Sequence, residues 1–344
     1  MRVTVADLSD PGETQAIDAF VAAHPEGQIF HRPQWSRAVE RGCGAKPHYL
    51  VARGASGTIS GLLPLSEIRS PWFGNSLVSA GFGVGGGILA DAGAALEALA
   101  EAAWACAVER GCASVELRGG PHPGDPWKEK AGIYADFAGD LPPGDEAILL
   151  SIKKRQRAEV RRGLGFGLEF REGDIDAHFH TYAASVRNLG TPVFPRALFE
   201  AMAAEFGDDA QILTAWKDGR PLSSVFSFFH KGIVHPFWGG GTGEARERRA
   251  NETLYYELMC RASRRGCTRF DFGRSKIGTG AYAFKKNWGF EPRPLAYTVR
   301  IADGGKAREI NPLDPKYRFQ VALWRRLPLW LANRLGPPIA RGLG

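Results

Sequence analysis

The sequence predicts an α/β protein built from two similar units in tandem. Predicted strands and helices follow one another along 344 residues, a length sufficient for two domains of ordinary size. Segment 98–119, ALAEAAWACAVERGCASVELRG, aligns without a gap with segment 253–274, TLYYELMCRASRRGCTRFDFGR. YLVARGASGTISGLLPL also resembles ILTAWKDGRPLSSVFSF in strand length, turn glycine and apolar pattern. Two copies of one unit explain both matches better than chance agreement between generic helix-glycine-strand segments.

The first unit begins with a predicted strand over 3–6 and a helix over 13–23. A short amphipathic helix, PQWSRAVER, precedes a hairpin of strands over 49–53 and 58–67, because ASG separates two apolar runs. Residues 70–87 form a loop rich in glycine and aromatic residues, which either approaches a ligand closely or only turns corners. A helix over 94–110, capped by Gly111, leads to a strand over 114–117.

A segment rich in proline, glycine and acidic residues, 119–147, marks the boundary between the halves. We therefore predict a first domain over 1–147, a second over 148–305 and a basic amphipathic tail over 306–344. The second domain opens with a basic helix, SIKKRQRAEVRRG, whose outward face is either solvated or holds phosphates. Further helices are predicted over 177–188, 196–206, 251–265 and 281–287, and strands over 211–216, 222–229, 233–238, 268–272 and 294–301.

The tail carries basic residues and no acid after Asp314. Its apolar residues include Trp324 and Trp330, so it either lies on an anionic membrane surface or packs as a C-terminal helix. We prefer packing, because Pro328 interrupts a long amphipathic helix. The basic residues are Lys316, Arg318, Arg325, Arg326, Arg334 and Arg341.

Composition indicates a globular protein with an anionic partner. Hydrophobic residues make up 44% and charged residues 24%, and the net charge is +7. The N-terminus has acids where a secretion signal needs an apolar core, and no run of 18 apolar residues occurs, so a cytoplasmic location is expected. The five cysteines lack CxxC spacing and favour neither disulfides nor a metal site.

The stretch 266–290, GCTRFDFGRSKIGTGAYAFKKNWGF, is the predicted functional centre. A strand ends near Asp271, glycines allow a tight loop, and a short helix then carries Phe284, Lys285 and Lys286. Ligands in sheets flanked by helices usually bind beyond strand ends. The alternative is a solvated turn followed by a surface helix.

The motifs GCTRFDFGRS and FKKNWGF, the duplicated unit and the early IFHRPQW, GLLPL and SPWFGNSLVSAGFG segments together resemble the FemAB-like proteins. The likeness covers about residues 25 to 335, and the branch it resembles most is associated with exosortase/PEP-CTERM systems of exopolysaccharide-producing bacteria. It implies two tandem GNAT-like domains, each with a mixed sheet and flanking helices. Characterised FemAB relatives transfer an aminoacyl group from aminoacyl-tRNA to an amine of a peptidoglycan precursor. In that family a Phe-Lys pair before an aromatic-Gly couple lies in the transfer cleft, which here corresponds to Phe284 and Lys285 ahead of Trp288 and Gly289.

The chemistry of acyl transfer suggests roles for individual residues. Lys285 would stabilise the developing oxyanion or leaving oxygen as a charged ammonium rather than act as a base. Asp271 would either accept a proton from the amine or, as we prefer, orient Arg274. We expect substrate contacts from Arg274, Lys286, Tyr282 and Trp238, and precursor phosphates at Arg187, Arg155 and Arg157.

The acyl donor stays open, because two features differ from the family pattern. The second half lacks the long charged helical hairpin of some FemAB members, which leaves tRNA binding open. The loop after Trp238 lacks the [QR]xxGx[GA] pattern that binds the acetyl-CoA pyrophosphate. The partners expected are an anionic envelope or polysaccharide precursor and tRNA, without DNA. The alternatives are an acetyl-CoA-dependent sugar acetyltransferase and a non-catalytic scaffold on the membrane surface.

Overall fold

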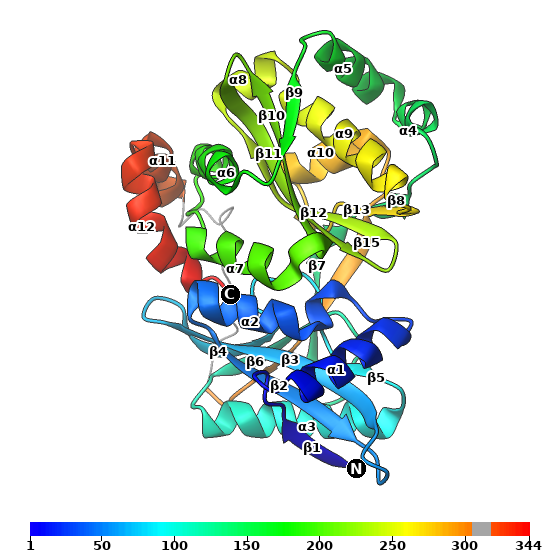
Figure 1. Ribbon diagram of the computed structural model, residues 1–344. Helices are drawn as coiled ribbons and strands as arrows, with labels where there is room; N and C mark the ends of the chain where they lie inside the picture. The colour runs from blue at the N-terminus through cyan, green and yellow to red at the C-terminus, as the bar shows by residue number, and fades with distance from the viewer. Residues whose placement is uncertain (305–317) are drawn as a thin grey trace.

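The computed structural model describes residues 1–304 and 318–344, which form two lobes, each a sheet covered by helices (Figure 1). The predictions for residue 305, for the domain boundary beside it and for Lys316 lie outside the described residues. The first-lobe elements are β1 (Arg2–Val5), α1 (Pro11–Ala23), α2 (Pro33–Cys43), β2 (Lys46–Arg53), β3 (Ile59–Ser70), β4 (Gly74–Ser79), β5 (Leu89–Ala90), α3 (Gly93–Glu109), β6 (Ser114–Arg118) and β7 (Lys128–Asp136). A short 3-10 helix, Ile29–His31, precedes α2.

The second lobe follows directly, and the chain then returns to the first sheet. Its elements are β8 (Ala138–Asp140), α4 (Asp145–Ser151), α5 (Lys154–Leu164), β9 (Glu169–Glu172), α6 (Ile175–Leu189), α7 (Arg196–Phe206), β10 (Ala210–Lys217), β11 (Arg220–His230), β12 (Ile233–Gly241), α8 (Gly243–Glu247), α9 (Ala250–Arg264), β13 (Arg269–Asp271) and α10 (Gly280–Trp288). A 3-10 turn, Gly207–Asp209, follows α7. The returning strands are β14 (Ser275–Lys276) and β15 (Arg293–Ile301), and the chain ends in α11 (Arg318–Arg326) and α12 (Leu329–Arg341).

The two sheets share one local plan, as the internal match predicted. The first has the order β1-β2-β3-β4-β6-β15-β7-β14, with β5 beside β3, and the second has the order β8-β13-β12-β11-β10-β9. In each, one parallel pair, β4 with β6 and β12 with β13, is joined by a crossover that contains α3 or α9. The aligned segments 98–119 and 253–274 are these helix-strand units.

Both crossover helices end in the same backbone motif. Gly111 and Gly266 adopt positive φ angles of 65° and 88°, a conformation that glycine reaches without a side-chain clash. The N–H of the following cysteine then bonds back into the helix, from Cys112 to Ala107 O and from Cys267 to Ala262 O, each at 2.9 Å. The predicted glycine cap is confirmed.

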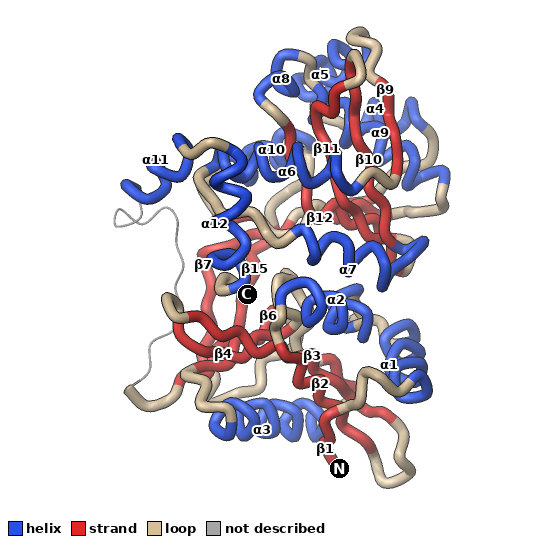
Figure 2. The backbone as a smooth tube through the Cα atoms, turned by 60° about the vertical axis from the view of Figure 1, so that its left-hand side comes forward, coloured by secondary structure: helices blue, strands red, loops and turns tan. Residues whose placement is uncertain are grey.

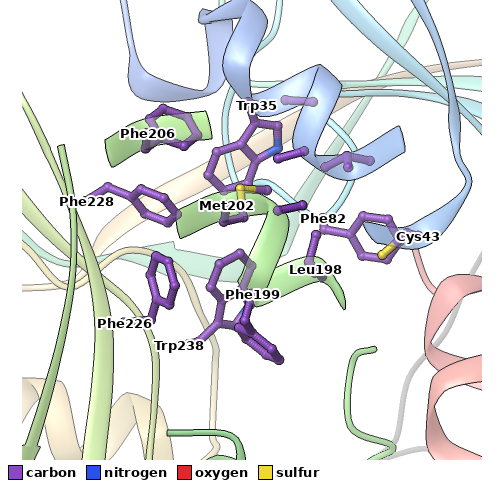
Figure 3. Packing of buried hydrophobic residues seen from close by; sticks show 14 of the residues in the cluster. Trp35, Cys43, Phe82, Leu198, Phe199, Met202, Phe206, Phe226, Phe228 and Trp238 are labelled. Atoms are coloured by element: carbon purple, nitrogen blue, oxygen red, sulfur yellow. The ribbon is translucent and has the colours of Figure 1, made fainter. Parts of the chain in front are cut away.

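Helices α2 and α7 lie side by side where the lobes meet (Figure 2). An aromatic core is packed at this boundary (Figure 3). Trp35 of α2 is fully buried and lies 5.4 Å from the Phe228 ring and 6.2 Å from the Trp238 ring, measured between centroids. Ion pairs surround this core, including one between Arg32 and Asp209 at 2.7 Å. The same aromatic cluster therefore holds both lobes together.

Two predicted boundaries differ from the structure. Residues 128–136, which lie in the predicted linker 119–147, form β7 in the first sheet. Strand 293–301, predicted inside the second domain, pairs with β6 and β7 of the first sheet. Sheet membership depends on pairing between distant segments, which a local pattern does not specify.

Candidate active site

A cavity of about 700 Å³ lies between the lobes, beyond the C-terminal ends of the parallel strands β12 and β13. The first lobe contributes Phe30, Phe82 and Val84 to its wall, and the second contributes residues from α6, β12, α9, β13 and α10. This is the place where sheets flanked by helices commonly bind ligands, as the sequence analysis expected. The cavity therefore belongs to both lobes.

One wall of the cavity is bare backbone at the end of β12. A Cβ atom on Gly240 would lie 2.5 Å from Ser185 Cβ, and one on Gly239 would lie 2.4 Å from the Tyr255 hydroxyl oxygen. Side chains are thus excluded by the packing of α6 and α9 against this strand. The glycines leave the backbone of β12 close to any molecule in the cavity.

Lys285 reaches the cavity from a helix that is anchored on its opposite side. Thr279 caps the N-terminus of α10, and Gly289 ends the helix with φ 107°. Phe284 and Trp288, one turn apart, pack against Tyr255 with ring centroids at 5.5 and 6.2 Å. With this face fixed on the core, the neighbouring Lys285 side chain is directed back toward the loop after β13.

The Lys285 ammonium is held at the cavity by two backbone carbonyls. Its Nζ donates to the carbonyl oxygens of Gly273 and Arg274, both at 2.9 Å. An ammonium has three N–H donors, so one is left without a hydrogen-bond partner among the described residues. Burial lowers the pKa of Lys285 to about 8, although the carboxylates of Asp136 and Asp271 oppose this shift. The side chain is therefore still mostly protonated at neutral pH.

Two carboxyl groups and a histidine stand behind Lys285. Asp271 Oδ1 accepts the Gly273 N–H at 2.7 Å, and Oδ2 lies 3.3 Å from His235 Nδ1. Burial would raise the pKa of Asp271, but these contacts and Lys285 hold it below its usual value. Asp136, at the end of β7, has its pKa raised to about 6 by burial and by the neighbouring Asp271 charge. Asp271 thus fixes the loop whose carbonyl groups hold Lys285.

Arg274 does not pair with Asp271, so the preferred sequence interpretation that Asp271 orients it is wrong. Its Nη1 donates to the Tyr297 hydroxyl at 2.7 Å, and its guanidinium carbon lies 4.5 Å from the centre of the Tyr134 ring. Tyr297 in turn donates to Val84 O at 3.2 Å. Arg274 follows β13 of the second lobe but is held by strands of the first lobe. It therefore places a positive charge at the cavity where the two lobes meet.

The structure brings together only part of the predicted site. Lys285, Phe284, Asp271, Arg274 and Trp238 line the cavity. The other predicted residues, Lys286, Tyr282, Arg155, Arg157 and Arg187, are not among its lining residues.

Each of these residues has a contact or a position that keeps it away from the cavity. Lys286 is exposed, and Tyr282 packs on Phe137 with ring centroids at 5.2 Å. Arg155 is exposed on α5, and Arg157 on the same helix donates to Leu150 O at 3.1 Å. Arg187 donates to Arg325 O in the tail at 3.2 Å. The geometry does not support a phosphate site at this cavity made from Arg155, Arg157 and Arg187.

Sequence reasoning missed His235, Asp136 and the first-lobe residues of the site. His235 is one of several residues in an apolar strand and carries no local signal. Asp136 lies in the segment interpreted as a linker, and reaches Lys285 only through the fold. Phe82 and Val84 belong to the segment 70–87, whose glycine content was the one signal of close approach to a ligand. This segment was predicted as a loop, but residues 74–79 of it form β4. Among the described residues, no group of three or more His, Cys, Asp or Glu side chains is placed to hold a metal ion.

The fold is of the GNAT type. Residues 151–286 match the family model described as an acetyltransferase (GNAT) domain. No curated protein is significantly similar to the chain in sequence.

Solved structures resemble the chain over both lobes. FemX is 16% identical, with a TM-score of 0.69 over 88% of this chain and 98% of that one. L-PGS from Bacillus licheniformis is 12% identical, with a TM-score of 0.54 over 94% and 99%. A tandem GNAT protein from the clavulanic acid biosynthesis pathway is 14% identical, with a TM-score of 0.56 over 89% and 99%. Identities this low show the fold alone, and they confirm the predicted α/β class with tandem GNAT-like units.

Proposed function

We propose that the chain transfers an acyl group, specifically an aminoacyl group, to an amine or a hydroxyl of an anionic cell-envelope or exopolysaccharide precursor. The observation that carries the proposal is the Lys285 ammonium, fixed by two carbonyls with one N–H left at a cavity between two GNAT-like lobes. The GNAT domain supports acyl transfer. The aminoacyl group, the tRNA that would carry it and the exopolysaccharide precursor are supported by the FemAB-like sequence features, with which the likeness to FemX agrees.

The proposed reaction needs little covalent chemistry from the protein. The acceptor nitrogen attacks the carbonyl carbon of the activated ester, the carbonyl oxygen becomes negative, and the C–O bond to the leaving alcohol then breaks. The proton lost by nitrogen goes to solvent or to the leaving oxygen. Holding both substrates in the cavity supplies roughly 7 to 11 kcal/mol of the barrier reduction. A donor aimed at the developing oxyanion adds about 3 to 4 kcal/mol, the contribution assigned to Lys285.

Asp271 acts in this scheme as a positioning residue. It holds the Gly273 N–H, and the Gly273 carbonyl holds Lys285. The negative charges of Asp271 and Asp136 also favour the protonated form of Lys285 against the cost of burial. Without them, the ammonium would be lost closer to neutral pH.

The test uses the purified chain with a panel of aminoacyl-tRNAs and acyl-CoA donors and with envelope or polysaccharide precursors. Mass spectrometry is used to detect a mass increment on the acceptor. Lys285→Met should lower the rate about 10²- to 10³-fold, because it removes one oxyanion donor. Lys286→Met is the matched control, since Lys286 is the exposed neighbour outside the cavity, and should keep wild-type activity. No increment with any donor would refute acyl transfer, and an active Lys285→Met would refute the role of this residue.

A second candidate function is acetyl-CoA-dependent acetylation of a sugar, favoured by one feature at the end of β12. The Thr242 hydroxyl lines the cavity, is buried and has no hydrogen-bond partner within the described part of the chain. Thr242, the backbone after Gly241 and the neighbouring Arg246 would together hold the pyrophosphate of such a donor. This function would be supported if acetyl-CoA served as a donor and none of the aminoacyl-tRNAs in the panel did.

A further inference from the structure

The C-terminal helices are attached to the fold at both lobes. In α12, Ala332, Gly336 and Ala340 are buried, and a Cβ on Gly336 would lie 3.0 Å from the Val193 backbone nitrogen. At the end of the chain, Arg118 Nη2 of the first sheet donates to Gly344 O at 2.9 Å. The tail thus packs on the protein, as the sequence analysis preferred, and one side of it is fixed.

The other side of the tail exposes large apolar residues. Phe319, Leu323, Trp330 and Leu335 are exposed by 78%, 53%, 68% and 44%. Two further exposed residues adjoin the tail: Leu189, whose carbonyl accepts from Arg325 Nη2 at 3.2 Å, and Trp72, which shares a pocket with Pro338 and Arg341. Such a concentration on one segment is unusual for residues that are merely left over at a surface. We call these six residues the apolar tail face.

Arginines accompany this face and lack acidic partners. Arg325, Arg326, Arg334 and Arg341 are exposed, and none forms an ion pair within the described residues. The sequence after Asp314 contains no Asp or Glu. Arginine beside exposed tryptophan and leucine is the composition of a helix that lies in the headgroup region of an anionic bilayer.

A basic pocket of about 560 Å³ continues the same surface into the first lobe. Lys46, Arg69, Arg110 and Arg341 line it together with one acid, Glu67. Glu67 is already engaged, with Oε2 at 2.8 Å from His48 Nε2 and Oε1 at 2.5 Å from Arg69 Nε. Arg110 Nε is buried and has no hydrogen-bond partner in the part of the chain that is described. The pocket therefore has positive charge in excess, suited to a phosphate group.

We propose that this surface docks the protein on an anionic phospholipid bilayer. The apolar tail face enters the interfacial layer, the arginines contact lipid phosphates, and the basic pocket receives one headgroup. Charge complementarity and the absence of any acid after Asp314 favour a lipid surface over a second protein. Every helix within residues 1–304 and 318–344 is too short or too polar to cross a bilayer.

Docking here would place the bilayer beside the cavity. Asn188, Leu189 and Phe194 line the cavity, and Leu189 also belongs to the apolar tail face. α5, the other basic helix, lies away from the tail in both views of the molecule (Figures 1 and 2). The two basic surfaces can therefore be tested separately.

The experiment is flotation of the full chain with vesicles of phosphatidylcholine alone and with vesicles that also contain phosphatidylglycerol. We expect binding to the anionic vesicles only, weakened by salt as Lys and Arg contacts are screened. Leu323→Ser with Trp330→Ser, and separately Arg326→Glu with Arg334→Glu, should each reduce binding at least tenfold. Arg155→Glu with Arg161→Glu on α5 makes the same change in net charge and should bind like wild type.

Thermal unfolding of each variant shows whether it is folded, and only the folded variants are compared in the flotation experiment. Failure of the wild-type chain to bind, equal loss in the tail and α5 charge variants, or equal binding to neutral vesicles overturns the proposal. Wild-type binding by the folded Leu323→Ser, Trp330→Ser variant would also overturn it, because the pocket would then act without the apolar face. None of these results depends on acyl transfer, so docking can fail while the proposed function stands.

Discussion

Lys285 combines two demands at the scale of a single residue. Its ammonium must be buried to act on a carbonyl group without competition from water, yet burial itself favours loss of the proton. Two backbone carbonyls and two carboxyl groups keep it charged, and the compromise is a pKa lowered to about 8. The charge on Lys285 is therefore controlled by residues from both lobes.

This pKa predicts the pH dependence of the reaction. If the protonated form of Lys285 is required, the rate is maximal below about pH 8 and falls above it. The test measures kcat against pH with a hydroxyl acceptor, because an amine acceptor titrates in the same range. Lys285→Arg should move this loss beyond the measurable range, since arginine stays charged throughout the pH range of the assay. The same alkaline fall in Lys285→Arg would assign the titration to another group.

Replacing Asp136 is expected to stabilise the folded protein, whereas most substitutions destabilise it. Its folded pKa is raised from 3.8 to about 6, so the folded state binds more protons than the unfolded state between these values. Stability consequently falls as pH rises through this window, and the ionised carboxylate costs up to about 3 kcal/mol at neutral pH. Asp136→Asn should stabilise the protein at pH 7.5, and the gain should disappear near pH 4. Urea unfolding at both pH values measures it, and a destabilised variant at pH 7.5 contradicts the assignment.

The same substitution should also affect catalysis. Removing the Asp136 charge takes away one of the two groups that favour the protonated Lys285. The alkaline fall in rate should then begin at lower pH than in the wild type.

At the scale of elements, α2 and α7 approach each other closely at one glycine. A Cβ on Gly42 would lie 2.4 Å from Leu198 Cα, and this neighbour is backbone that cannot rotate away. Gly42→Ala gains up to about 1 kcal/mol in helix propensity, but forcing the helices apart costs roughly 1 to 3 kcal/mol or more. We expect a net loss of stability in thermal or urea unfolding. Gly93→Ala in α3, where nothing lies within 4 Å, should be neutral or slightly stabilising.

Elements defined by local pattern were predictable, and those defined by long-range pairing were not. Helices α3 and α9 show an apolar stripe and a glycine cap in the sequence itself. Strand β7 is half exposed and lies among prolines and glycines, so only its pairing with β15 makes it a strand. The site divides in the same way. Phe284 and Lys285 could be predicted because they lie in one continuous stretch of sequence. Asp136 could not, because it comes from the other lobe. The positive charge of Arg155 also does not reveal which way α5 faces.

At the scale of the whole molecule, the chain crosses between the lobes more than once. β8 follows β7 directly but belongs to the second sheet, and β15 returns from the second lobe to lie between β6 and β7. α11 and α12 then contact α6 before the chain ends against Arg118. The cavity depends on this connectivity, because Arg274 follows β13 but is held by Tyr134 and Tyr297 of the first sheet.

This connectivity predicts that neither half folds alone. A chain cut after residue 147 leaves the first half without β15, the strand that joins β6 to β7, and leaves the second half without β8. It also divides the aromatic core that contains Trp35 and Phe228. We expect fragments 1–147 and 148–344 to be aggregated or unfolded by circular dichroism and gel filtration when expressed separately, and to form a soluble complex when expressed together. A monomeric, cooperatively unfolding fragment 1–147 would show that the first sheet does not need β15. The first lobe would then be an independent domain, and the cavity would lie at its surface.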